Sequence, residues 1–257
     1  MPRPASLRRF GLLAPVLLVL TAAAALPARA ADDLEVEVRN LVQGEFRGLS
    51  RELGLALAAY QLRPAEPLGF LRFDAGIEVT AVDYNEKRSY WQNAVDDPDD
   101  LPGYLPVPKA HVNFGLPLGI DLGGMYSKIP ESNVEFWGAD VKWAIVRGGL
   151  VWPALAVRGA FTQLRGVDEL DLKTRSLDAS VSKGFGPVTP YVGGGRVWID
   201  AEPKGAAAAP PVSLGKESHT EDRLFAGLGL RLLFLSLTAE ASFSDVNAYT
   251  LRANFSF

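Results

Sequence analysis

The sequence of 257 residues contains no cysteine and only two histidines. Without cysteine the chain has no disulfide, no thiolate nucleophile and no Cys-ligated zinc or iron–sulfur site. Two histidines are too few for a three-His metal centre. The formal net charge of −4 also excludes the broad basic surface that nucleic-acid binding requires. We therefore expect no metal, no cofactor and no nucleic-acid partner.

Long apolar runs are also lacking: after residue 30, no stretch approaches the 18 consecutive apolar residues that indicate a membrane-spanning helix. The N-terminus differs. Its first ten residues carry three Arg and no acid, the next sixteen are uncharged, and Ala28-Arg29-Ala30 offers small residues for cleavage. This layout predicts a secretory signal peptide over residues 1–30. Its removal would leave 22 basic and 30 acidic side chains, a net charge of −8.

From Phe73 onward the sequence alternates with a period of two, which is the pattern of a strand with two different faces. In the first segment Phe73 and Ile77 share one face, whereas Asp74 and Glu78 share the other. Segments of this kind have about the length of a tilted membrane strand, which is ~9–11 residues. Ten of them follow one another, at 72–81, 107–114, 118–127, 134–146, 155–162, 176–185, 191–200, 223–231, 235–243 and 249–257.

Alternation alone does not decide which face lies outside, because a soluble barrel buries its apolar face and a membrane barrel turns it toward lipid. Aromatic residues near the segment ends favour the membrane barrel, whose interface girdles lie there. These residues are Tyr126, Phe136, Trp152, Phe185, Tyr191, Trp198, Tyr249 and Phe257. The one clear charge on the apolar faces, Lys183, is close to a short turn, from which it can snorkel.

The connections between the segments also alternate in length. Counted back from Phe257, the connections that fall at one end are 245–248, 201–220, 164–171, 128–133 and 85–106. Those at the opposite end are all short, at 233–234, 186–189, 147–152 and 115–118. Long outside loops and short periplasmic turns are typical of outer-membrane barrels.

In these features the chain resembles bacterial outer-membrane β-barrel proteins. The resemblance covers the signal peptide, the strand-and-loop rhythm of residues 70–257 and the last strand, Tyr249-Thr250-Leu251-Arg252-Ala253-Asn254-Phe255-Ser256-Phe257. That strand is similar to the C-terminal signal that the barrel assembly machinery recognises, with Tyr249, Phe255 and Phe257 on its apolar face. The resemblance implies the outer membrane of a Gram-negative bacterium, with membrane lipid, lipopolysaccharide and the assembly machinery as partners.

The segment between the signal peptide and the barrel, residues 31–69, fits two structures. Part of it alternates like a strand, but Phe46, Leu49 and Leu53 follow helical spacing. We favour a short amphipathic helix near 40–52, which continues into either a plug or further barrel strands. Because bacterial barrels have an even number of strands, ten and twelve are both open.

The polar faces predict a charged lumen that is nearly neutral overall. We assign to its lining Arg72, Asp74, Glu78, Lys109, His111, Asp121, Asp140, Lys142, Arg158, Asp178, Arg196, Asp200, Arg223, Arg231, Glu240 and Arg252. Such a lining either fills a narrow barrel with ion pairs, because unpaired buried charges are costly, or forms a small pore for polar solutes. Wide aqueous pores are typical of 16–18 strands, so ten or twelve leave at most a narrow path.

Four motifs have simple structural interpretations. His111 is expected to form hydrogen bonds in the lumen, because no adjacent Ser forms a catalytic pair with it. His219 lies in the predicted long loop and is expected at the surface. The acid run of residues 96–100 lacks EF-hand spacing and is expected to be solvated. Gly193-Gly194-Gly195 lacks the Lys-Ser/Thr of a phosphate loop and is expected to permit close strand packing or a bend that narrows the lumen.

Together these patterns predict an all-β, antiparallel up-and-down transmembrane barrel that is not an enzyme. The first functional hypothesis is a narrow passive channel or uptake porin with a small solute as ligand. The second is a closed structural or surface-interaction barrel whose long loops contact envelope partners. The third is an envelope lipid-modifying enzyme that uses His111 or His219.

Overall fold

Ten antiparallel strands form a closed barrel in which each strand pairs with its neighbours in the sequence. The computed structural model describes residues 36–257 except 59, 61–62, 96–100, 131 and 212, so the predicted signal peptide and the acid run lie outside the described residues. The strands are β1 (Phe73–Asp83), β2 (Leu105–Gly115), β3 (Ile120–Lys128), β4 (Glu135–Arg147), β5 (Ala154–Arg165), β6 (Leu170–Ser182), β7 (Val188–Pro203), β8 (Glu217–Leu232), β9 (Leu235–Phe243) and β10 (Asn247–Ser256). Of the two predicted strand numbers, ten is confirmed.

The first and last strands close the barrel. β1 pairs with β10 in a register that places Glu78 opposite Arg252. Just beyond this ladder, the backbone N–H of Phe73 donates to the Phe257 carbonyl (3.1 Å), and that of Phe257 donates to the Phe73 carbonyl (2.9 Å). Because every strand is paired on both sides, the barrel leaves no strand edge exposed.

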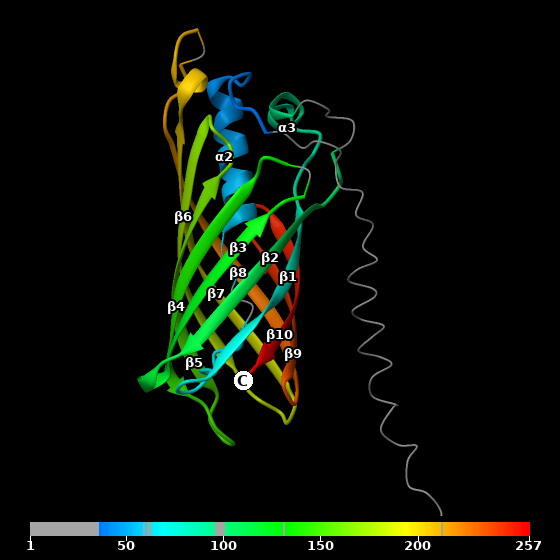
Figure 1. The fold of residues 1–257 in the computed structure, drawn as a ribbon, viewed down its shortest axis with the longest axis vertical. Helices are drawn as coiled ribbons and strands as arrows, with labels where there is room; N and C mark the ends of the chain where they lie inside the picture. The colour runs from blue at the N-terminus through cyan, green and yellow to red at the C-terminus, as the bar shows by residue number, and fades with distance from the viewer. Residues whose placement is uncertain (1–35, 59, 61–62, 96–100, 131, 212) are drawn as a thin grey trace, which may run out of the picture.

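The two ends of the barrel differ as the connection lengths predict. One end, called here the long-loop end, carries the connections 84–104 and 204–216 and lies at the top of Figure 1. The opposite end, called the short-turn end, has turns such as 116–119 and 233–234. The connection predicted at 201–220 is shorter in the structure, because β7 and β8 extend into it at both ends.

The helix α2 (Gln43–Leu57) lies inside the barrel at the long-loop end (Figure 1). Phe46, Leu49, Leu53 and Leu57 recur every three or four residues, so they share one face of the helix. The predicted helix exists, although it begins three residues later and ends five residues later than expected. The segment forms a plug and adds no strand to the barrel.

The remaining helices are short and lie in connections. α3 (Ser89–Ala94) belongs to the β1–β2 connection, η2 (Pro117–Gly119) to a short turn and η3 (Gly205–Ala208) to the β7–β8 connection. Within the described ranges, no helix has the length and apolar character needed to cross a membrane.

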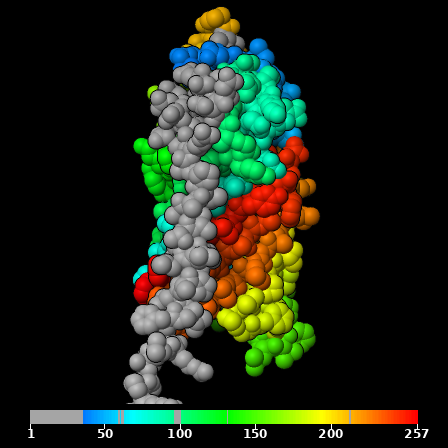
Figure 2. Space-filling model, turned by 90° about the vertical axis from the view of Figure 1, so that its right-hand side faces the viewer, coloured from blue at the N-terminus to red at the C-terminus, as the bar shows by residue number. Residues whose placement is uncertain are grey.

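The exterior of the barrel wall carries many exposed apolar side chains. The strands run obliquely across this wall, as the orange and red bands of the C-terminal strands show in Figure 2. Along β1, Phe73 and Ile77 are 43% and 63% exposed, whereas Asp74 and Glu78 are 2% and 5% exposed. The alternation therefore turns apolar side chains outward and charged ones inward. The outward side chains at the C-terminus include the three residues of the predicted assembly signal, Tyr249 and Phe255 of β10 and Phe257 just after it.

Candidate functional site

The interior of the barrel is filled by two chemically different regions. At the long-loop end, α2 packs against inward-facing apolar side chains, and this region is called the apolar half. At the short-turn end, charged side chains from the strands meet the segment that connects α2 to β1, and this region is called the charged half.

The apolar half is built around α2. The four aligned side chains Phe46, Leu49, Leu53 and Leu57 are at most 1% exposed. Their cluster includes strand residues that are equally buried, among them Phe136, Leu172 and Ile199. Burial of a side chain of this size stabilises by about 1.5–3 kcal/mol, so the helix is held by several such increments.

A glycine lets the helix approach the barrel wall. A Cβ atom on Gly54 would lie 2.4 Å from Cγ2 of Ile199 on β7. No side chain larger than hydrogen fits between the helix and this strand without displacing Ile199, which explains a glycine in the last turn of α2 despite its poor helix propensity.

Ion pairs join the polar face of α2 to β8 and to the β9–β10 connection. Nε of Arg47 lies 3.0 Å from Oε2 of Glu217, and Arg51 pairs with Glu221 and with Asp245, the latter at 2.5 Å. These pairs follow one side of the helix, so the plug is fixed by polar contacts as well as by apolar ones.

His219 belongs to this polar contact, which corrects the prediction of a surface loop residue. β8 begins at Glu217, so His219 lies within that strand. Its Nε2 is 3.1 Å from Oγ of Ser50. A serine and a histidine at this distance have the spacing of a nucleophile and its base. Ser50 is 0% exposed, however, and its hydroxyl also lies within hydrogen-bond distance (3.1 Å) of the Arg47 carbonyl of the preceding helical turn. The pair is therefore a packing contact that a substrate cannot reach.

The β1–β2 connection is fastened to the same helix. Glu52 accepts hydrogen bonds from the Tyr90 hydroxyl (2.7 Å) and from Nε1 of Trp91 (2.6 Å). At the other end of α3, Nδ2 of Asn93 donates to Glu45 (2.8 Å). The plug and the α3 loop consequently form one continuous structure across the long-loop end.

The charged half contains a buried cluster of guanidinium and carboxylate groups. Asp178 receives two hydrogen bonds from Nη2 of Arg223 (2.8 and 2.7 Å) and one from Nε of the same residue (3.0 Å). Nη1 of Arg158 lies 3.4 Å from the same carboxylate, and Nε of Arg158 lies 3.2 Å from Asp140. Charge-assisted pairs of this kind are geometrically specific, which fixes the relative positions of four strands.

Glycines on β7 make room for this cluster. A Cβ atom on Gly195 would lie 2.3 Å from Oδ1 of Asp178, and one on Gly193 would lie 2.4 Å from the ring of Phe225. The structure therefore agrees with the interpretation of the three-glycine run as a site of close packing.

The segment between α2 and β1 passes through the charged half, and its residues 63–68 are called the strap. Nη2 of Arg63 lies 3.0 Å from Oδ2 of Asp140, and its Nη1 lies 3.6 Å from Asp121. Nζ of Lys142 donates to the strap carbonyls of Pro64 (3.0 Å) and Glu66 (2.8 Å) and pairs with Asp121 at 3.1 Å. The strap is thus held against the wall by charged side chains of the adjacent strands β3 and β4.

A third group surrounds His111. Its two ring nitrogens face Asp74 at 4.0 Å and Glu78 at 3.9 Å, beyond hydrogen-bond distance, and no described residue supplies a closer partner. The predicted hydrogen bonds of His111 are therefore absent among the described residues. Asp74 instead accepts from Arg252 (2.9 Å), and Glu78 pairs with Lys109 (3.2 Å).

Within the described residues, this half holds six acids and six bases close to one another. The acids are Asp74, Glu78, Asp121, Asp140, Asp178 and Glu240, and the bases are Arg63, Lys109, Lys142, Arg158, Arg223 and Arg252. Arg63 was not among the predicted lining residues, because it lies in the strap, where no alternation indicates an inward face. Its charge completes the balance.

Twelve of the sixteen predicted lining residues lie inside the charged half; they are these six acids, His111 and the bases other than Arg63. Arg72 is exposed just before β1. Arg231 lies at the short-turn end and borders a cavity there.

The prediction for Arg196 and Asp200 was wrong. Arg196 forms an exposed pair with Asp222 (2.6 Å), and Asp200 lies 3.9 Å from exposed Arg175. Their neighbours Val197 and Ile199 are 0% exposed, so it is the apolar face of β7 that points inward here. The reason is that this part of the strand borders α2, whose packing requires apolar partners.

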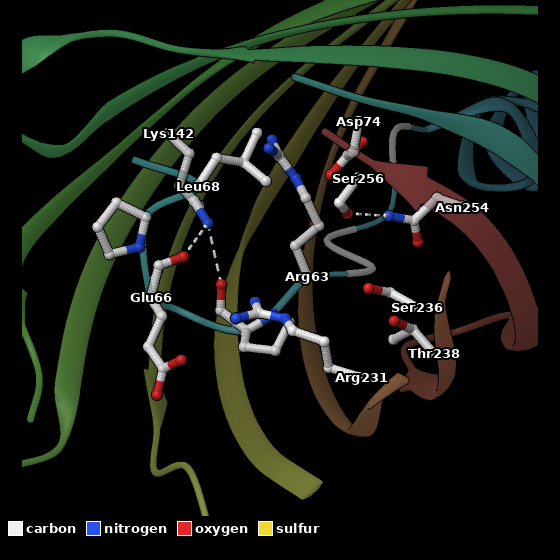
Figure 3. Close-up of a pocket in the computed structure, with 12 residues that line it drawn as sticks. Arg63, Glu66, Leu68, Asp74, Lys142, Arg231, Ser236, Thr238, Asn254 and Ser256 are labelled. Atoms are coloured by element: carbon white, nitrogen blue, oxygen red, sulfur yellow. Dashed lines mark hydrogen bonds between the residues drawn. The ribbon is translucent and has the colours of Figure 1, made fainter. Parts of the chain in front are cut away.

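A small cavity of about 50 Å³ opens at the short-turn end (Figure 3). Arg63, Lys142 and Asp74 of the charged half form one side of it, and Arg231 of β8 reaches in from another. Hydroxyl groups of β9 and β10 border the remainder.

The fold and its interior define a class: a closed ten-stranded antiparallel barrel with a helix inside. No family model matches the chain, and no curated protein matches it. Among solved structures, the N-terminal β-barrel domain of Pseudomonas aeruginosa OprF is similar over 74% of this chain and 99% of that chain, with 14% identity and a TM-score of 0.34. The KdgM porin is similar over 72% and 99%, with 7% identity and a TM-score of 0.37. Acinetobacter baumannii Omp33 is similar over 73% and 98%, with 6% identity and a TM-score of 0.33. These similar structures are outer-membrane β-barrels of Gram-negative bacteria.

Proposed function

We propose that the protein is a closed outer-membrane barrel, exported by its signal peptide, that presents a rigid surface at the long-loop end and neither conducts solutes nor catalyses a reaction. The observation that carries this proposal is the interior itself. A helix fills the apolar half and twelve charged groups with a strap fill the charged half.

Membrane placement is supported by the apolar exterior. Large outward-facing apolar side chains are 49–63% exposed on the barrel wall, among them Ile77, Leu177, Leu228 and Leu251. Contact of these side chains with water is unfavourable, whereas contact with lipid is favourable. Lys183, the one charge predicted on this face, bends its Nζ to the turn carbonyls of Gly149 and Leu150, both at 2.6 Å.

A solute path would require both halves of the interior to rearrange. Release of α2 would expose four large buried side chains, at a cost on the order of 6–12 kcal/mol if each contributes about 1.5–3 kcal/mol. Withdrawal of the strap would also remove Arg63 from Asp121 and Asp140 and leave buried carboxylates with fewer partners. The closed state is therefore strongly favoured, and the geometry supports the closed barrel over the channel.

The surface at the long-loop end has the order that an interaction surface needs. Glu52 ties α3 of the β1–β2 connection to the plug, and Gln43 exchanges hydrogen bonds with the backbone of Gly215 at the end of the β7–β8 connection, so the helix holds these described parts of the two connections in place. Preorganised loops bind partners at a lower entropic cost than mobile ones. In this proposal, envelope partners and lipopolysaccharide contact this end, and the assembly machinery recognises the last strand.

Planar-bilayer recording tests the proposal. The refolded chain, without residues 1–30, is expected to give no steady ion conductance. A variant that lacks residues 36–57 removes the plug, and a matched variant that lacks the exposed loop residues 208–211 leaves the plug and its buried contacts in place. We expect occasional conductance from the first variant only. Steady channels from the intact chain would overturn the closed barrel and favour the passive channel.

The absence of catalysis has its own test. Ser50→Ala and His111→Ala together remove the hydroxyl of the buried Ser–His pair and the histidine of the charged half. We expect the lipid composition of envelopes that contain this double variant to equal that of envelopes with the unmodified protein. A lipid species present only with the unmodified protein would contradict the proposal.

A further inference from the structure

The cavity at the short-turn end contains charged groups, and most of them are already neutralised. The carboxylate of Asp74 accepts from Arg252 (2.9 Å) and from Nδ2 of Asn113 (2.7 Å). Lys142 pairs with Asp121 at 3.1 Å and donates to two strap carbonyls. These groups therefore add little net charge to the cavity.

Arg231 is different. Its side chain reaches into the cavity from the end of strand β8 (Figure 3), and it makes no ion pair or side-chain hydrogen bond with any described residue. The remaining carboxylate at the cavity is that of Glu66. It points away from Arg231 in Figure 3, and its Oε1 lies 3.2 Å from the position of a Cβ on Gly184, in the β6–β7 turn.

The groups that face Arg231 across the cavity can donate hydrogen bonds. Ser236 and Thr238 come from adjacent inward positions of β9, and their hydroxyls have no partner among the described residues. Ser256 and Asn254 come from β10 and are bonded only to each other, at 3.5 Å. A guanidinium that lacks a carboxylate, together with hydroxyl and amide donors, matches the needs of an oxyanion.

We propose that this cavity is a binding site for a small oxyanion, a phosphate or a carboxylate, held by the planar guanidinium of Arg231 with the hydroxyls of Ser236 and Thr238. The size of the cavity, about 50 Å³, restricts the bound part to a single such group. In the membrane orientation proposed above, the site opens to the periplasm. The ligand is then either a free anion of that compartment or the acidic end of a larger periplasmic molecule.

Isothermal titration of the refolded protein in detergent micelles tests this site with two probes, inorganic phosphate and acetate, at constant ionic strength. We expect saturable binding of at least one probe, and the preferred probe distinguishes phosphate from carboxylate chemistry. Arg231→Gln is expected to weaken that binding at least tenfold. Ser236→Ala, which keeps the charge and removes one donor, is expected to weaken it less.

Arg72→Gln is the matched control, because Arg72 is an exposed arginine at the same end of the barrel that does not border the cavity. It is expected to change the affinity less than twofold. Equal losses in the Arg231 and Arg72 variants would show a diffuse charge effect and overturn the site, as would no saturable binding of either probe. If Arg231→Gln does not fold, unchanged binding by Ser236→Ala together with Thr238→Ala would overturn it. Bilayer recording is independent of these outcomes, so a failed binding site leaves the closed barrel untouched.

Discussion

The apolar half and the charged half fill the same barrel with opposite chemistry. In the apolar half, inward positions such as Leu172 and Ile199 are hydrophobic because they touch a helix that presents Leu49 and Leu53. In the charged half, inward positions are acids and bases, because here they partner one another and the strap. The comparison shows that the residue types at the inward positions of a strand match what fills the lumen beside them. A single strand can contact both kinds of filling.

β7 shows the change within one strand. Near its start, Gly193 and Gly195 face inward and make room for Phe225 and Asp178. Further along, Ile199 faces inward against α2. Arg196 and Asp200, which alternate with these inward residues, therefore face the exterior.

The largest expected loss of stability comes from breaking a buried ion pair, and an exposed pair of similar geometry serves as the comparison. Asp178→Ala removes the carboxylate shared by Arg223 and Arg158 and leaves two buried guanidinium groups without it. We expect the free energy of unfolding to fall by about 3–5 kcal/mol in guanidinium titrations followed by tryptophan fluorescence. Asp222→Ala breaks the exposed pair with Arg196 and is expected to cause no measurable change. Equal losses would contradict the division between buried and exposed charges.

The apolar half is probed by one leucine inside and one outside. Leu53→Ala should lower the free energy of unfolding by about 2–5 kcal/mol, since it removes a fully buried side chain and leaves a cavity against the wall. Leu177→Ala makes the same change at an outward position that is 56% exposed, and it should cost much less. If the two variants lose the same stability, α2 is not part of the core.

Substitution of two glycines of α2 tests how closely the helix approaches the barrel wall. Gly54→Ala places a methyl group within 2.4 Å of Ile199, and overpacking of this kind costs about 1–3 kcal/mol. Gly44→Ala places the same group in open space, where better helix propensity should stabilise by up to about 1 kcal/mol. Thermal unfolding of both variants should therefore shift in opposite directions; shifts of the same sign would refute the close contact.

The smallest effect concerns the connection between the plug and the α3 loop. Tyr90→Phe removes the hydrogen bond to Glu52 and should cost about 0.5–1.5 kcal/mol. Burial and the bond to Glu52 raise the pKa of the Tyr90 phenol, so its contribution is complete below its ordinary pKa near 10 and is lost as pH rises further. Unfolding between pH 8 and pH 11 should show a steeper loss for the unmodified protein than for the variant, and parallel curves would count against the contact.

The sequence predicted most of the wall. Period-two alternation indicated ten strands, and it assigned the correct faces to β1, where Asp74 and Glu78 point inward, and to β10, where Arg252 does. Alternation has the same form whichever face is inside. The prediction took the polar face of every strand as inward, so it misassigned Arg196 and Asp200 of β7, which lie where the lumen is apolar.

The contents of the lumen were harder to predict than its wall. Helical spacing at Phe46, Leu49 and Leu53 indicated α2 but not its position against β7, because that depends on a contact between Gly54 and Ile199 that no local pattern encodes. Arg63 lies in an irregular strap, so its pairing with Asp140 follows from the path of the chain alone.

Hydrogen exchange of the α2 amides in the folded protein tests the central claim most directly. If the helix is a permanent part of the core, the amides of residues 46–57 should exchange as slowly as those of the β6 and β7 strands that surround it. Fast exchange of the helix beside well-protected strands would show that the plug leaves an intact barrel, and the closed interior would then be wrong.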